Sequence, residues 1–245
     1  MRKSNIILLF LTPLYMWIGH ILSVFPHEYA HSLIAWALGF KANPLDIIYG
    51  GWSWQNIIFL ANIDENVNYV LIDQLGHRQL ISLIAFAGPG IGTLAVYLIT
   101  LYLLRKSFNS YLYYLVLWLN LDAIRELWAY VPLRSLTDRA DIAHINESLG
   151  ISHWWIFMLI SPLVAWGVWN FFSNTLKNSY EKLGLLSTAS KVILLILTVF
   201  YFFTLTGMQI LMANYDFITN TLTWISFIAI PFILIFCWPK QQYVR

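Results

Sequence analysis

The sequence predicts an all-α polytopic membrane protein with about six transmembrane helices and a re-entrant or β-hairpin-like loop after the first. Hydrophobic residues make up 59% of the 245 residues and charged residues only 11%, whereas soluble domains contain about 25% charged residues. Six apolar segments approach the roughly 20 residues that a helix needs to cross a bilayer. These segments are 5–24, 79–104, 111–133, 152–173, 191–213 and 220–238.

Composition also narrows the classes of partner. The net charge is +2 and no basic run is present, which argues against nucleic acid as a ligand. The single cysteine, Cys237, excludes an intramolecular disulfide and a cysteine-based zinc cluster. The lipid bilayer is therefore the first predicted partner, and no linker divides residues 1–245 into more than one domain.

The first apolar segment follows Arg2 and Lys3 and looks like a signal peptide. Because no small-x-small cleavage site follows it, we expect a retained helix that continues to about residue 38. The basic residues of the loops fall on one side of the predicted spans, and the positive-inside rule then places both termini in the cytoplasm. They are Arg2, Lys3, Arg105, Lys106, Lys177, Lys182, Lys191, Lys240 and Arg245.

The loop over residues 39–78 is unusually apolar for a connection between spans. It contains the stretches PLDIIYGGWSW and NIIFLANI, which are rich in strand-forming residues and interrupted by Gly50 and Gly51. Irregular backbone at membrane depth must be shielded by protein or line a wet cavity. This pattern predicts the re-entrant or hairpin-like segment.

The stretch FPHEYAHSLIAWALGF places ionisable residues in apolar surroundings at the end of the first span. His27 and His31 are four residues apart, so a helix presents both on one face, where they can bind one Zn²⁺ ion. Glu28 points toward the neighbouring face, which is the position of the general base in His-Glu-x-x-His metalloproteases. His20 is seven residues before His27 and lies near the same stripe.

The alternative to a metal site is that this spacing arose by chance. The histidines would then be ordinary buried side chains that are satisfied by hydrogen bonds. Ionisable residues within a membrane span are costly and mark functional sites, which favours the metal. A catalytic zinc usually takes three protein ligands, and the stretch YVPLRSLTDRADIAHI after the third span offers two. Asp138 or Asp141 can complete the set. The alternative is that both are solvated acids paired with Arg134 and Arg139.

Between these elements lies IAFAGPGIGTL, a run of small residues within the second span. Gly88, Pro89, Gly90 and Gly92 weaken a helix and allow backbones to approach closely. The spacing of Gly88 and Gly92 is of the small-xxx-small type that brings membrane helices together. Such a run indicates packing more often than chemistry.

In this order and within the membrane, the three pieces resemble the site-2 protease class of intramembrane metalloproteases, the M50-like peptidases. The first motif of that class is matched by His27, Glu28 and His31. Its central Ala-Gly-Pro element is matched by Ala87, Gly88 and Pro89. Its third motif, a proline upstream of a zinc-binding aspartate, is matched by Pro132 with Asp138 or Asp141. The resemblance implies a metalloprotease-like core over residues 1–145 and additional transmembrane helices over 146–245.

The third motif departs from the family pattern. Ala129 stands where the family has asparagine, and Arg139 rather than glycine follows Asp138. Related proteins with a Pro-Leu-Arg start keep an aspartate at the spacing of Asp141, so Asp141 is the preferred ligand and Asp138 the second choice. The asparagine that commonly follows Ala-Gly-Pro is replaced by Gly92 or Thr93.

The resemblance implies a zinc-dependent intramembrane endopeptidase that holds one Zn²⁺ ion and hydrolyses membrane-embedded protein or peptide substrates. Glu28 is then the general base, and Arg134 or His144 is expected to help stabilise the oxyanion. The altered third motif leaves open a catalytically inactive, protease-like scaffold. A transporter that uses these residues as an ion or proton relay is a further alternative. The sequence names neither a substrate nor an oligomeric state.

Overall fold

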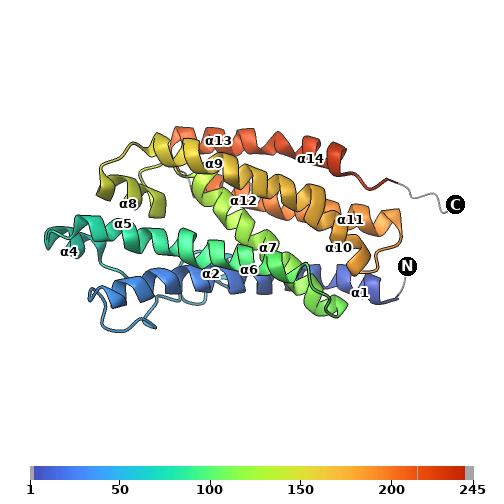
Figure 1. Cartoon of the computed structure of the whole chain (residues 1–245), viewed down its shortest axis with the longest axis horizontal. Coiled ribbons are helices and arrows are strands. Elements are labelled where there is room, and N and C mark those ends of the chain that lie inside the picture. The colour runs from blue at the N-terminus through green and yellow to red at the C-terminus, as the bar shows by residue number, and fades with distance from the viewer. Residues whose placement is uncertain (1–2, 214, 241–245) are drawn as a thin grey trace.

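The protein forms a helical bundle, which a computed structural model describes over residues 3–213 and 215–240 (Figure 1). Four π-helical segments, labelled η1 to η4, interrupt the helices. The first half of the chain contains α1 (Lys3–Phe10), α2 (Thr12–Ala37), α3 (Trp54–Phe59), α4 (Tyr69–Gln74), α5 (Arg78–Phe86), η1 (Ala87–Thr93), α6 (Leu94–Leu103), α7 (Ser110–Trp128) and η2 (Ala129–Leu133). The second half contains α8 (Ala140–Leu149), α9 (His153–Asn170), η3 (Phe171–Thr175), α10 (Leu176–Lys182), α11 (Thr188–Val199), η4 (Phe200–Leu205), α12 (Thr206–Met212), α13 (Phe217–Phe227) and α14 (Ala229–Cys237).

In the described part of the chain, four continuous helical stretches are long and apolar enough to cross a membrane. They are Arg78–Leu103, His153–Lys182, Thr188–Met212 and Phe217–Cys237. The predicted class of all-helical membrane protein is therefore supported, and these stretches correspond to four of the six segments expected from the sequence. The other two expected spans fall mainly in α2 and α7, with α1 at the start of the first and η2 at the end of the second. Both are long helices, but the polar residues that they carry lower their hydropathy.

The bundle is organised around α7. In Figure 1 this helix runs obliquely between α2 and α6 on one side and α9 on the other, and it contacts all three. Trp118, Leu117 and Leu121 of α7 are fully buried and pack with Phe172 and Phe202 from the second half of the chain. One continuous apolar core thus joins the two halves.

The loop between α2 and α5 does not form the hairpin expected as one option from the sequence. Within the described residues it contains the short helices α3 and α4 and a single antiparallel bridge between Ile48 and Asp64, without a strand. Asn56 explains the difference, because its buried side chain closes the loop on itself. Its amide donates to the carbonyls of Tyr49 at 2.6 Å and Gly51 at 2.8 Å, and its oxygen accepts from the backbone of Asn62 at 3.0 Å.

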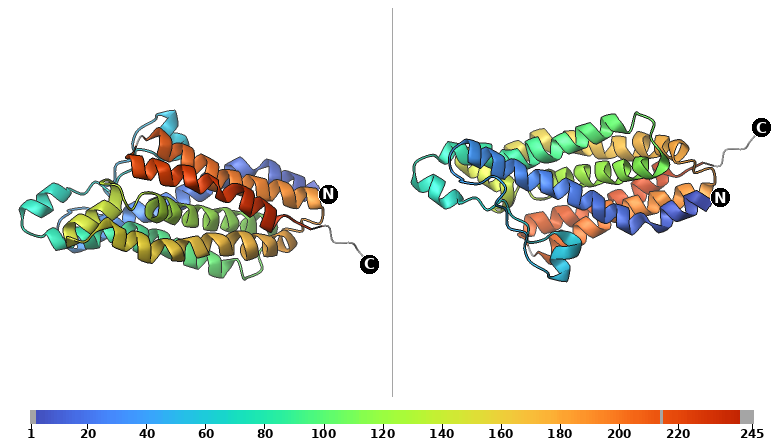
Figure 2. Two further views of the ribbon diagram at one scale, coloured as in Figure 1. Left: turned by 90° about the horizontal axis from the view of Figure 1, so that it is seen from above. Right: turned by 90° about the horizontal axis from the view of Figure 1, so that it is seen from below.

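The loop also turns back along α2. The ring nitrogen of Trp17 donates to the carbonyl of Ile57 at 2.8 Å, and Nε2 of His20 lies 3.0 Å from the carbonyl oxygen of Phe59. Figure 2 shows this segment, in light blue, projecting from the side of the bundle. Trp52 and Trp54 are 93% and 75% exposed there, so the projecting surface is strongly apolar.

Candidate metal centre

Three buried side chains from distant parts of the chain converge at one point. His27 and His31 come from successive turns of α2, and Asp141 comes from the first turn of α8. Nε2 of His27 lies 3.1 Å from Nε2 of His31 and 3.1 Å from Oδ2 of Asp141. Nε2 of His31 lies 3.4 Å from the same carboxylate oxygen. The three atoms thus form a nearly equilateral triangle.

The other nitrogen of each ring, Nδ1, has a hydrogen-bond partner outside the triad. Nδ1 of His31 donates to the carbonyl of Ile84 at 2.7 Å, and a carbonyl can only accept. The proton of neutral His31 is therefore on Nδ1, and the lone pair is on Nε2. Nδ1 of His27 lies 2.9 Å from the hydroxyl of Thr93. Metal-binding histidines are commonly held in this way through the nitrogen that does not bind the metal.

The donor set fits a Zn²⁺ ion. Bonds of about 2.0–2.1 Å in tetrahedral geometry place neighbouring ligand atoms about 3.3–3.4 Å apart, which is close to the edges of the observed triangle. Two imidazole nitrogens and a carboxylate oxygen are ligands of catalytic zinc sites, which leave the fourth position open. If all three atoms present lone pairs, they repel one another in this buried site, and a bound cation would relieve that repulsion.

Gly88 of η1 lines this site at very short range. A Cβ atom at this position would lie 2.1 Å from Nε2 of His31 and 2.7 Å from Cε1 of His27. The neighbouring Gly92 is equally constrained, since its Cβ would lie 2.6 Å from the carbonyl oxygen of Pro26. The small residues of η1 therefore let its backbone pack directly against the histidine face of α2, which gives Gly88 a role at the site. Pro89 is buried in the same segment.

Asp141 and Asp138 are in different environments. Asp141 is 9% exposed and contacts both histidines, whereas Asp138 is exposed and lies outside the triad. Between them Ala140 adopts a φ of +69°, a left-handed conformation that turns the chain into α8. Burial alone would raise the pKa of Asp141, but the adjacent rings of His31 and His27 hold that pKa well below its ordinary value. Asp141 is thus an anion at neutral pH and suited to bind a cation.

Glu28 is half-buried on α2 beside the triad. It lies near enough to His31, Asp141 and Glu65 for their charges to interact with its carboxylate. Among the described residues it makes no ion pair with a lysine or arginine. Its carboxylate therefore lies beside the triad without a basic partner among these residues.

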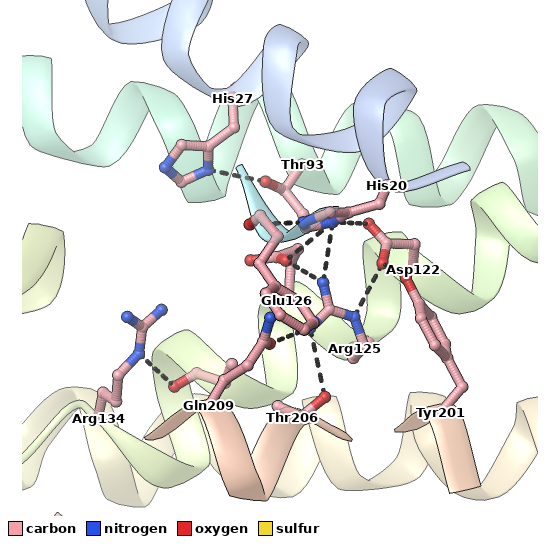
Figure 3. A network of polar contacts seen from close by, with 12 residues as sticks. His20, His27, Thr93, Asp122, Arg125, Glu126, Arg134, Tyr201, Thr206 and Gln209 are labelled. Carbon is pink, nitrogen blue, oxygen red and sulfur yellow. Dashed lines mark hydrogen bonds and ion pairs between the residues drawn. The ribbon is translucent and has the colours of Figure 1, made fainter. Parts of the chain in front are cut away.

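His20 lies outside the triad, in a second buried network (Figure 3). Nε of Arg125 donates to Asp122 at 2.8 Å, while its Nη2 donates to Glu126 and lies 3.1 Å from Nδ1 of His20. Tyr201 donates to Asp122 from η4. His20, Asp122 and Glu126 are close enough to hold a metal. Because the guanidinium already lies among them and pairs with both carboxylates, we interpret this cluster as an ion network between the two halves of the bundle.

Arg134 and His144, expected from the sequence near the oxyanion, make no direct contact with the triad in the described structure. The guanidinium of Arg134 packs over the ring of Tyr130, with 4.3 Å from its carbon to the ring centre. The ring of His144 stacks on Tyr69, with their centres 4.6 Å apart, and it lines a pocket on the loop side of the molecule. The expected oxyanion role has no structural support for either residue.

From the sequence, Thr93 was considered only as a residue that replaces the asparagine of the family. Its contact with His27 was not predicted. The signal was present, because a hydroxyl among the small apolar residues of GIGT must find a partner once buried. We expect Thr93→Val to weaken zinc binding about 10- to 100-fold, as loss of such a partner typically does. Competition with a chelating dye measures this affinity.

Thr198→Val is the matched control for that substitution. Its hydroxyl is also buried, but it bonds to carbonyls of its own helix, α11. Zinc affinity that falls equally in both variants would indicate general destabilisation and would contradict the role of Thr93.

Comparisons of the chain with protein-family models, curated proteins and solved structures give no match. The case for a function therefore depends on the residues and their geometry.

Proposed function

We propose that this protein is a zinc-dependent intramembrane endopeptidase whose ligands are His27, His31 and Asp141 and whose general base is Glu28. The observation that carries the proposal is the convergence of two imidazole nitrogens and a carboxylate oxygen within 3.4 Å of one another. Asp141 is 114 positions from His27 in the sequence, so only the fold brings its carboxylate to the two histidines. The spacing of the two histidines and the adjacent glutamate is that of zinc metallopeptidases.

When bound, a Zn²⁺ ion supplies a Lewis acid that polarises the scissile carbonyl and lowers the pKa of a water molecule to about 7. Residues of the chain supply metal binding and proton transfer. His27, His31 and Asp141 would hold the ion and leave its fourth position to water, and Glu28 lies beside them on α2. Glu28 takes the proton from the attacking water and later delivers it to the leaving amine. The backbone of η1 at Gly88 lies directly against both histidine rings and leaves no room there for a side chain.

The membrane location supports a substrate that is itself embedded in the bilayer. We propose that α2 and α7 are also transmembrane, which gives six spans, with both termini in the cytoplasm. In Figure 1 α1 and the end of α14 lie at the same end of the bundle, as an even number of spans requires. The loop segment that returns along α2 to Trp17 and His20 is then a re-entrant element. A transmembrane substrate has to unwind locally before its peptide bonds reach the site.

The decisive experiment is Glu28→Gln. We expect this variant to retain one equivalent of zinc, because Glu28 is not a ligand, and to lose proteolytic activity by about 10²–10⁴-fold, the typical contribution of a general base. Cells expressing the wild type or the variant are compared by mass spectrometry of new protein termini within transmembrane segments. Zinc content is measured on both purified proteins.

The outcomes separate the proposal from the alternatives. Identical sets of termini in both strains, with zinc bound in both proteins, would contradict an endopeptidase and favour a protease-like scaffold. Absence of zinc from the wild-type protein would contradict the metal centre itself and favour an ion-handling role for the buried charges.

A further inference from the structure

The two histidines of the proposed site are not held equally well. His31 donates to a backbone carbonyl, whose position is fixed by α5. His27 instead meets the hydroxyl of Thr93, which can rotate. A hydrogen bond at one ring edge also leaves the imidazole free to tilt about its side-chain bonds. A further contact is needed to fix the plane of His27.

Tyr130 supplies that contact. Its ring is stacked on the imidazole of His27, with centres 4.8 Å apart and an angle of 22° between the planes. This geometry is within the range of favourable aromatic pairs. Tyr130 belongs to η2, a π-helical segment that also contains Pro132. Such segments alter the direction of side chains within a helix and occur often at functional sites.

Tyr130 is held in turn by Arg134, which itself contacts a residue far along the chain. The guanidinium carbon of Arg134 lies 4.3 Å from its ring centre. Arg134 is fixed by two bonds, from Nε to the carbonyl of Ala129 at 3.1 Å and from Nη1 to the hydroxyl of Tyr215 at 3.2 Å. Tyr215 precedes α13 and packs with the apolar cluster of Ala129, Leu133 and Ile210. In Figure 3 the guanidinium of Arg134 points toward the region of His27 without bonding to it.

We propose that Tyr130 is a positioning residue for His27, and that Arg134 and Tyr215 hold Tyr130 in place. Tyr215 thereby supports a metal centre whose ligands all lie in the first 141 residues. This inference rests on the proposed zinc site and gives the C-terminal helices a part in it. Arg134 then acts through Tyr130, in place of the oxyanion role expected from the sequence.

Purified full-length protein in detergent tests the inference through zinc affinity and through the visible absorption spectrum of the Co²⁺-loaded form. We expect Tyr130→Leu to raise the Kd for Zn²⁺ about tenfold, comparable to loss of other residues that orient a ligand. The Co²⁺ bands should shift because the plane of one ligand ring changes. Tyr130→Phe keeps the ring and should have the Zn²⁺ affinity and the Co²⁺ spectrum of the wild type. Tyr215→Phe removes the hydroxyl and should produce a smaller shift of the same bands.

Tyr102→Leu is the matched control, since Tyr102 also lies under a cation, with Lys106 at 4.6 Å from its ring centre, but on the exposed face of α6. It should leave affinity and spectrum unchanged. If Tyr130→Leu does not fold, Arg134→Met removes the cation while keeping the apolar stem and is expected to shift the Co²⁺ bands.

Failure of the positioning role and failure of the zinc site would give different results. Wild-type affinity and an unchanged spectrum in Tyr130→Leu, or in Arg134→Met where that variant replaces it, would overturn the positioning role and leave the zinc site intact. A wild-type protein that binds neither Zn²⁺ nor Co²⁺ would overturn both the proposed function and this inference.

Discussion

Substituting His31 or Asp141 with alanine is expected to abolish stoichiometric zinc binding. Each residue supplies one corner of the triangle of donor atoms, with edges of 3.1–3.4 Å. Loss of a residue that merely orients a ligand costs about 10- to 100-fold in affinity, so loss of a ligand itself should cost more. Metal analysis of protein purified at neutral pH gives the zinc content per chain directly.

Asp138→Ala is the control for Asp141→Ala. Both aspartates lie in the same short stretch, but Asp138 is exposed and outside the triad. We expect Asp138→Ala to retain a full equivalent of zinc. Equal zinc content in the two aspartate variants, whether full or reduced, would refute Asp141 as the third ligand.

The second large effect is expected from Gly88→Ala, which adds one methyl group at the centre of the site. That methyl carbon would lie 2.1 Å from Nε2 of His31 and 2.6 Å from Cε1 of the same ring, far inside van der Waals contact. Both rings are held by hydrogen bonds on their other side, so they cannot withdraw without losing Ile84 and Thr93. We expect loss of zinc and of activity together, measured on the purified variant.

Gly90→Ala, in the same π-helical segment, separates this steric effect from a general effect of alanine in η1. A Cβ at Gly90 would meet the ring of Phe86 at 2.2 Å, but Phe86 is half exposed and its ring can swing away. Zinc binding should survive in Gly90→Ala. Normal zinc binding in Gly88→Ala would show that the backbone of η1 does not line the site as closely as described.

The fold class and part of the site could be predicted from the sequence, because both depend on local patterns. Apolar length identifies membrane helices, and a spacing of four residues places His27 and His31 on one helix face whatever surrounds them. The preference for Asp141 over Asp138 came from a family resemblance, and the structure places Asp141 in the triad. No local pattern distinguishes the two aspartates, since the turn at Ala140 that separates them is a tertiary feature.

The rest depends on contacts between residues far apart, which spacing does not encode. Tyr130 is one of many aromatic residues, and only the packing of η2 against α2 gives it a particular neighbour. Asp122, Arg125 and Glu126 lie within the third predicted span, but the sequence placed His20 only near the helix stripe of His27 and did not connect it with these charges. The expected hairpin failed because Asn56 satisfies the loop backbone without a strand partner.

The arrangement of donors on α2 and α8 has a consequence for how the chain matures. An ion bound between His27 and Asp141 would act as a cross-link that closes a loop of more than a hundred residues, which restricts the unfolded chain far more than the folded one. Capture of the ion must then wait until the intervening helices have been inserted and α8 has docked. Bound zinc would thereby stabilise only the fully assembled protein. In metal-starved cells the chain should remain without zinc and be degraded more rapidly.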